Sequence, residues 1–253
     1  RTIDRRGLIQ TTAGVLLLSG LNAASAWATG RPSVMETWAR ELVGLKEDLQ
    51  AGRIDVLTWQ AQVERLNQSV PLEDIVHYLD IEAVTRNFAY DSNLAEARDP
   101  VLPAEIVGQS GMRRWFVRVF GLRRGGAIIP HVHNNMVSAH LVLSGSFRAR
   151  THDRIRDLHD AVVLRPTFDG VIGRGDVVTM SDRRNNQHWM IAREDRSMTF
   201  DVGIVGLPES WEYGHEAPRY NMIYVDPTAS TESNGTIFAP TMTWEEASAK
   251  FAA

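Results

Sequence analysis

Pro130-His131-Val132-His133 is the stretch of sequence that decides the fold, together with His188, which lies 55 residues after His133. Because side chains alternate between the two faces of a β-strand, His131 and His133 are expected to point to the same side. That spacing allows two imidazoles to reach one metal ion. A third imidazole can join them only from another strand, and His188 lies in a second strand-like stretch. These three histidines are the candidate metal ligands.

Glycines frame both histidine stretches. Gly125-Gly126 precede the pair, and the strand-like residues 137–145 follow it and end at a glycine. Gly175-Asp176 opens the stretch that ends at His188. Across residues 112–206, this arrangement resembles the two sequence motifs of the cupin superfamily.

The resemblance implies a mainly β protein with the double-stranded β-helix of the RmlC-like cupins, a jelly-roll barrel. It also implies that His131, His133 and His188 bind one divalent metal ion. The usual cupin pattern has a glutamate seven residues before the strand-closing glycine, and this chain has Ser138 there. The expected site is therefore neutral, as in three-histidine cupins such as the cysteine and diketone dioxygenases. A neutral site leaves the metal its full charge and more open positions.

His140 lies two residues beyond Ser138, so it should point into the same interior. It is the candidate catalytic residue, as a proton carrier, a contact of the substrate or a fourth ligand. A lowered pKa would make it a neutral base. The alternative is a structural histidine of the core.

The first 28 residues have the pattern of an export signal. Asp4-Arg5-Arg6-Gly7 resembles a twin-arginine (Tat) motif, and 22 uncharged residues follow from Gly7 to Ala28. Ala26-Trp27-Ala28 is a small-x-small cleavage site. The expected location is the periplasm, or the inner membrane if the segment is retained as an anchor. A buried N-terminal helix is the alternative.

Composition limits the classes of function. The chain of 253 residues has no cysteine, which excludes disulfides, thiolate metal sites and a cysteine nucleophile. Its net charge is −4, and −6 without residues 1–28, because that segment holds three arginines and one aspartate. An acidic chain gives no electrostatic reason to expect nucleic acid as a partner.

Hydrophobic periodicity divides the rest of the chain. Residues 29–90 are predicted to form a helical extension, with helices through Trp38, Trp59 and Ile75 that pack on the later domain. Residues 89–111 are predicted to be irregular. Short apolar runs separated by glycine and asparagine then predict strands, and the cupin barrel is assigned to residues 91–253 with a late strand and a short C-terminal helix.

The expected function is an Fe(II)-dependent dioxygenase-type oxidoreductase that acts on a small organic substrate. Imidazole also suits Mn, Ni, Cu and Zn, so these metals remain alternatives. A non-redox lyase or isomerase, and a non-catalytic metal-binding protein or membrane-anchored accessory subunit, are the other two hypotheses, because one fold hosts all of them. The resemblance also allows a homodimer.

Overall fold

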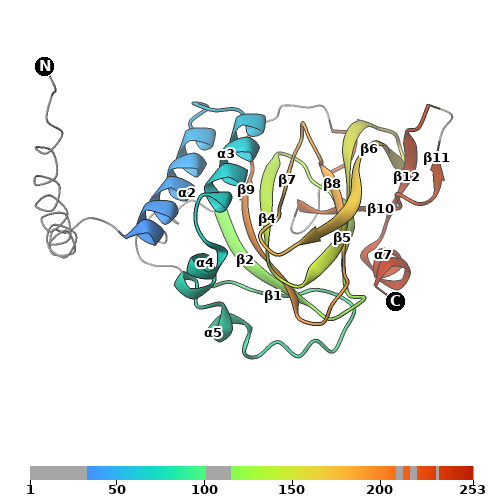
Figure 1. The fold of residues 1–253 in the computed structure, drawn as a ribbon. Coiled ribbons are helices and arrows are strands. Elements are labelled where there is room, and N and C mark those ends of the chain that lie inside the picture. Colours follow the sequence, from blue (N-terminus) through green and yellow to red (C-terminus); the bar gives the residue numbers. More distant parts are fainter. Residues whose placement is uncertain (1–32, 101–114, 209–212, 217–220, 232–233, 253) are drawn as a thin grey trace, which may run out of the picture.

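The structure is a computed structural model that describes residues 33–100, 115–208, 213–216, 221–231 and 234–252 (Figure 1). The export signal expected in residues 1–28 lies outside these ranges. Within them, no helix is both long and apolar enough to cross a membrane.

Two antiparallel sheets stack face to face and confirm the predicted jelly-roll barrel. One sheet contains the run β2-β9-β4-β7 and the other the run β3-β8-β5-β6, so β9 returns to lie between β2 and β4. Two four-stranded sheets linked in this order are the jelly roll, or double-stranded β-helix, of cupins. Its strands are β2 (Trp115–Leu122), β3 (Ala127–Val132), β4 (Met136–Ser144), β5 (Ser146–Asp157), β6 (Ala161–Gly173), β7 (Val177–Ser181), β8 (Gln187–Ala192) and β9 (Ser197–Val205).

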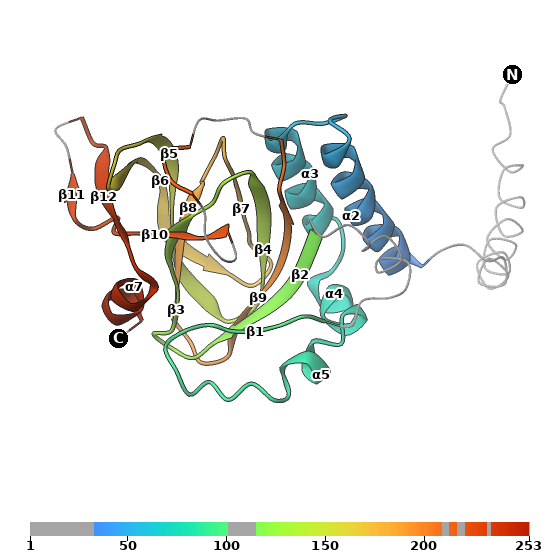
Figure 2. The ribbon, with the colours of Figure 1, turned by 180° about the vertical axis from the view of Figure 1, so that it is seen from behind.

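Short strands extend both sheets. β1 (Glu96–Arg98) pairs with β2, although the sequence predicted an irregular chain there. β10 (Ile223–Val225), β11 (Ser230–Thr231) and β12 (Ile237–Met242) extend the second sheet. The C-terminal helix α7 (Trp244–Phe251) starts at a capping box formed by Thr243 and Glu246. Figure 2 shows β10 and α7 on the side of the barrel remote from the N-terminal helices.

Four helices precede the barrel: α2 (Val34–Gln50), α3 (Val56–Gln68), α4 (Leu72–Tyr78) and α5 (Ile81–Thr85). Ser33 and Glu36 form a capping box that starts α2, and the Asp55 side chain caps α3 by accepting a hydrogen bond from Thr58 N. Figure 1 shows α2 and α3 beside the sheet that contains β9, β4 and β7.

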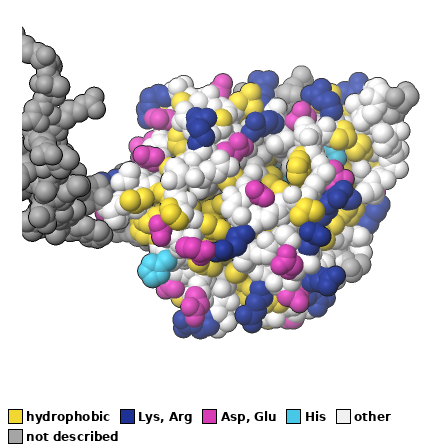
Figure 3. All heavy atoms as spheres, viewed as in Figure 1, with side chains coloured by type: hydrophobic (Ala, Val, Ile, Leu, Met, Phe, Trp, Pro, Cys, Tyr) yellow, Lys and Arg dark blue, Asp and Glu magenta, His cyan; other side chains and the backbone are white. Residues whose placement is uncertain are grey.

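Acidic and basic side chains are interspersed on the molecular surface that faces the viewer in Figure 3, which has the same view as Figure 1.

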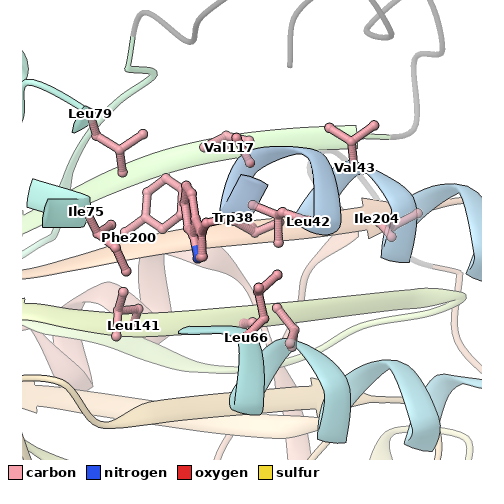
Figure 4. Close-up of a cluster of buried hydrophobic side chains, with 14 of the residues drawn as sticks. Trp38, Leu42, Val43, Leu66, Ile75, Leu79, Val117, Leu141, Phe200 and Ile204 are labelled. Carbon is pink, nitrogen blue, oxygen red and sulfur yellow. The ribbon is translucent and has the colours of Figure 1, made fainter. Parts of the chain in front are cut away.

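The helices share one hydrophobic core with the outer face of that sheet. Trp38 of α2 packs against Phe200 of β9, with ring centroids 6.2 Å apart, and Leu66 and Leu141 lie in the same cluster (Figure 4). Buried Gln60 of α3 adds hydrogen bonds of 3.2 Å to Thr179 Oγ1 and 2.8 Å to Ser181 Oγ on β7. The helices therefore cover the outer face of this sheet. The polar residues on its inner face line the barrel interior.

The turn between β4 and β5 requires glycine at position 145. Gly145 has φ +67°, and a Cβ there would lie 2.9 Å from Ser197 Cα. We expect Gly145→Ala to lower the free energy of unfolding by more than about 1 kcal/mol. Gly44→Ala is the matched control, because Gly44 lies within α2 and a Cβ added there would meet nothing within 4 Å; it should raise that energy by up to about 1 kcal/mol. Urea unfolding measures both, and equal values would contradict the assignment.

Candidate metal centre

The structure brings the three predicted ligands together. His131 of β3 lies directly opposite His188 of β8 in the strand register, and His133 immediately follows β3. One nitrogen from each ring lies within 4.8 Å of the others, and all three residues are buried. The ring centroid of His131 lies 4.6 Å from that of His133 and 4.2 Å from that of His188.

Backbone carbonyls orient two of these rings. His131 Nδ1 donates to Ile129 O at 2.7 Å, and His133 Nδ1 donates to Asn221 O. A carbonyl oxygen only accepts, so Nδ1 carries the proton in both rings and the lone pair is on Nε2. Ligating histidines in metalloproteins are commonly held in this way. The two rings therefore present Nε2 as their donor atom.

The donor set fits a transition-metal ion. His188 Nδ1 is buried and has no hydrogen-bond partner among the described residues. A buried polar atom without a partner costs about 1–3 kcal/mol. A bound cation would compensate for it, and imidazole nitrogen suits Fe, Ni, Cu and Zn.

Burial also keeps the rings uncharged. Loss of solvent lowers the pKa of His131 to about 4, and it lowers the pKa values of His133 and His188 well below 6.5, where the neighbouring histidines add to the effect. Metal binding requires neutral imidazole. The three rings are therefore in the ligand-competent state at neutral pH.

This burial makes the stability of the metal-free protein depend on pH. Above 6.5 the buried histidines are neutral in both the folded and the unfolded chain; between 6.5 and about 4 only the unfolded chain binds protons readily, so acidification favours unfolding. Burial raises the pKa of Asp182 to about 6 and that of Asp201 to about 7, which opposes the effect. The histidines with lowered pKa values outnumber these two carboxyl groups: they are His131, His133, His140, His152 and His188.

We therefore expect the free energy of unfolding to fall as the pH drops below 6.5. Each net histidine contributes about 1.4 kcal/mol per pH unit within its window. Urea unfolding in the presence of a chelator measures the slope. A stability that is flat or rises on acidification would contradict the buried, neutral state of the histidines.

His140, the predicted catalytic residue, lies beside the cluster but outside it. Its ring centroid is 5.7 Å from that of His188, and its Nδ1 lies 3.2 Å from Thr199 Oγ1. It lines the same cavity as the three histidines. Burial lowers its pKa to about 3, with His131 adding to the effect. His140 is thus a neutral group at the edge of the site.

The carboxyl group of Asp201 lies at the site and was not predicted from the sequence. It lies on β9 directly opposite His140 in the register, and its Oδ2 is 3.6 Å from His140 Nε2. Its Oδ1 accepts a hydrogen bond from Ser138 Oγ. Burial raises the pKa of Asp201 to about 7. The signal in the sequence was a lone acidic residue within the apolar strand 198–205.

A buried polar network fixes the backbone at His133. Arg154 Nη1 donates to His133 O at 3.0 Å and to Asn134 Oδ1 at 2.8 Å, and Arg154 forms a two-pronged ion pair with Asp157. Asn186 accepts from His133 N at 3.2 Å and donates to His133 O at 3.1 Å. His133 is therefore held from both sides by side chains of other strands and loops.

The histidines open onto a cavity of about 1480 Å³. Small-molecule pockets usually measure about 300–1,000 Å³. Polar groups gather around the histidines, where Ser138, His140 and Asp201 line the wall. Elsewhere the lining is mostly apolar or aromatic: Leu94, Phe116, Phe120, Ile129, Met136, Val205, Met222, Tyr224, Met242 and Trp244. The site can therefore hold an organic molecule next to the metal ligands.

Two arginines near the barrel, Arg148 and Arg150, do not line the cavity. Both form ion pairs with Asp169 on the exposed side of β5 and β6.

The chain was compared with known families, curated proteins and solved structures. No protein-family model matches the chain, and no curated protein matches its sequence. Solved structures that match include an 11S globulin from Wrightia tinctoria (17% identity, TM-score 0.30), KdgF from Halomonas sp. (16%, 0.29) and a cupin superfamily protein from Desulfitobacterium hafniense DCB-2 (10%, 0.30). They cover 36%, 38% and 46% of this chain and 21%, 72% and 81% of their own chains. The fold assignment depends on the strand order described above and not on these similarities.

Proposed function

We propose that the protein is a mononuclear metalloenzyme of the oxidoreductase class, an Fe(II)-dependent dioxygenase that acts on a small organic substrate. The observation that supports it is the cluster of three neutral, buried imidazoles within 4.8 Å of one another at the wall of a cavity. Three uncharged ligands suit a metal that must also bind substrate and oxygen. Mn, Ni, Cu and Zn are alternatives for the same donor set.

Different residues of the site would have different roles. His131, His133 and His188 would hold the metal, which would supply Lewis acidity and, as iron, redox chemistry. The apolar cavity wall would exclude water and orient the organic part of the substrate. His140, neutral and close to His188, would contact the bound substrate and help to orient it beside the metal ligands.

A non-redox lyase or isomerase is the second candidate. The specific observation in its favour is the Asp201 carboxyl group, 3.6 Å from His140 Nε2 in the same cavity. Proton transfer between carbon atoms or hydroxyl groups needs such an acid–base residue and needs no oxygen. Consumption of oxygen distinguishes the two functions.

Metal analysis followed by an oxygen assay tests the proposal. Protein purified from its own host should contain about one metal ion per chain, and the Fe(II)-loaded protein should consume oxygen with a 1,2-diol, a diketone or a thiol. Turnover without oxygen would favour the lyase or isomerase. Absence of metal would refute both enzymes and leave a non-catalytic role.

We further propose that Tat export carries the folded, metal-loaded protein to the periplasm. The support is the Arg5-Arg6 motif with the apolar stretch and cleavage site that follow it. Fractionation of the host with N-terminal sequencing tests this. A washed membrane fraction that retains Arg5 would indicate an anchor, and a cytoplasmic protein would refute export.

A further inference from the structure

Asp201 is a buried carboxyl group that reaches the cavity and forms no ion pair with a lysine or arginine of the described residues. It is 4% exposed and lines the cavity wall. The charged or titratable groups that face it are Arg118 on β2 and His140 on β4, its two neighbours in the register. Arg118 Nε forms its ion pair with Asp99 at 2.9 Å, and no lysine or arginine of the described residues forms one with Asp201.

A second carboxyl group in the same protein shows the contrast. Asp157 is also buried, and it is fully paired: Arg154 binds both of its oxygens, and Gly214 N donates to it at 2.8 Å. A buried carboxylate with a purely structural role is expected to be paired in this way, because an unpaired buried charge is costly. A carboxyl group left without a cation and facing a cavity is instead typical of a functional residue.

Ser138 and His140 position the two oxygens of Asp201 differently. Ser138 Oγ donates to Oδ1, while Oδ2 is directed toward His140 Nε2 at 3.6 Å. Ser138 occupies the place where the cupin pattern has a glutamate. The carboxyl group is therefore supplied by β9, and it accepts a hydrogen bond from the serine of β4.

We propose that Asp201 is the acid–base residue of this site, and that its Oδ2 takes a proton from a bound substrate and returns it to the product. The bond from the proton to a substrate oxygen or carbon breaks, its electron pair stays on the substrate, and the carboxylate becomes a neutral carboxylic acid. No oxidant is needed. Neutral His140 is then a positioning residue that keeps Oδ2 oriented toward the cavity. The inference rests on the proposed function, since the substrate must bind beside the three histidines.

The protonation state of the carboxyl group supports this role. Burial raises the pKa of Asp201 to about 7. An acid–base residue is most effective when its pKa lies near the working pH. His140, with a pKa of about 3, would exchange protons poorly at that pH.

The experiment compares wild type with Asp201→Asn and with Asp226→Asn. Asp226 is a matched control, since it is a largely buried carboxyl group that pairs with Lys250 outside the cavity. Catechol is titrated calorimetrically into the zinc-loaded protein in buffers of different ionisation enthalpy, which counts the protons released. At pH 8, where Asp201 of the free wild type is mostly ionised, Asp201→Asn should release about one proton more than wild type, because wild type keeps that proton on Asp201. Asp226→Asn should match wild type. Equal counts in all three proteins would overturn the proposal.

Two further readouts separate this inference from the proposed function. In metal-free protein labelled with ¹³C-aspartate, the carboxyl resonance that Asp201→Asn removes should titrate near neutral pH; titration in the usual acidic range would overturn the proposal even if zinc binds. Failure of zinc to bind would refute the proposed function while this titration still decides on Asp201. With any substrate that turns over, Asp201→Asn should lower kcat by about 10²- to 10⁴-fold with little change in KM.

Discussion

His188→Ala is expected to abolish tight metal binding and, with it, the stabilisation that metal confers. A ligand at 1,000 times its Kd raises the free energy of unfolding by about 4 kcal/mol. For a chain of this size, each kcal/mol corresponds to roughly 2–4 °C in Tm, so saturating zinc should raise Tm of wild type by about 8–16 °C. The variant keeps only two of the three imidazoles, both at the end of β3, and should lose most of this shift.

The measurement is the difference in Tm with and without metal, so a change in the stability of the metal-free variant cancels. His152→Ala is the control. His152 is also a buried histidine with a lowered pKa, but its Nδ1 bonds to Gln187 Oε1 and it is not part of the cluster. It should keep the full metal-induced shift. If His188→Ala also kept its shift and its metal content, the ligand assignment would be wrong.

Local sequence patterns predicted the barrel and the histidine cluster. The two-residue period places His131 and His133 on one face, and the glycines at 125, 145 and 175 mark turns that end or begin strands; all three have positive φ. The jelly-roll topology then sets β8 beside β3, which brings His188 opposite His131. The helical periodicity at Trp38 and Trp59 predicted α2 and α3 in the same local way.

Long-range register could not be predicted. Asp201 meets Ser138 across 63 residues only because β4 and β9 pair in one particular register, and a slip by one residue would turn Asp201 to the other face. The three-histidine ligand set was therefore predicted, but the carboxyl group of Asp201 that lies beside His140 was not. β1 was missed because its three residues form a strand only by pairing with β2.

Arg154→Met should produce the second large effect, on stability and on metal affinity together. The side chains of Arg154 and Asp157 are 1% and 3% exposed. Removing one partner of a buried ion pair leaves an uncompensated charge, which costs about 3–5 kcal/mol. The variant also loses the hydrogen bonds from Arg154 to His133 O and Asn134 Oδ1 that fix one ligand. Loss of a group that orients a ligand typically weakens metal binding about 10- to 100-fold.

Two comparisons separate these effects. Arg148→Met breaks an exposed pair with Asp169, whose side chains are 43% and 48% exposed, so it should cost at most about 1 kcal/mol and leave metal affinity unchanged. The double variant Arg154→Met/Asp157→Leu removes both buried charges and should recover much of the lost stability, as apolar replacements of buried pairs often do. It should not recover metal affinity, because the hydrogen bonds from Arg154 to His133 O and Asn134 Oδ1 are still missing. Recovery of both would show that Arg154 supports the fold alone and does not position His133.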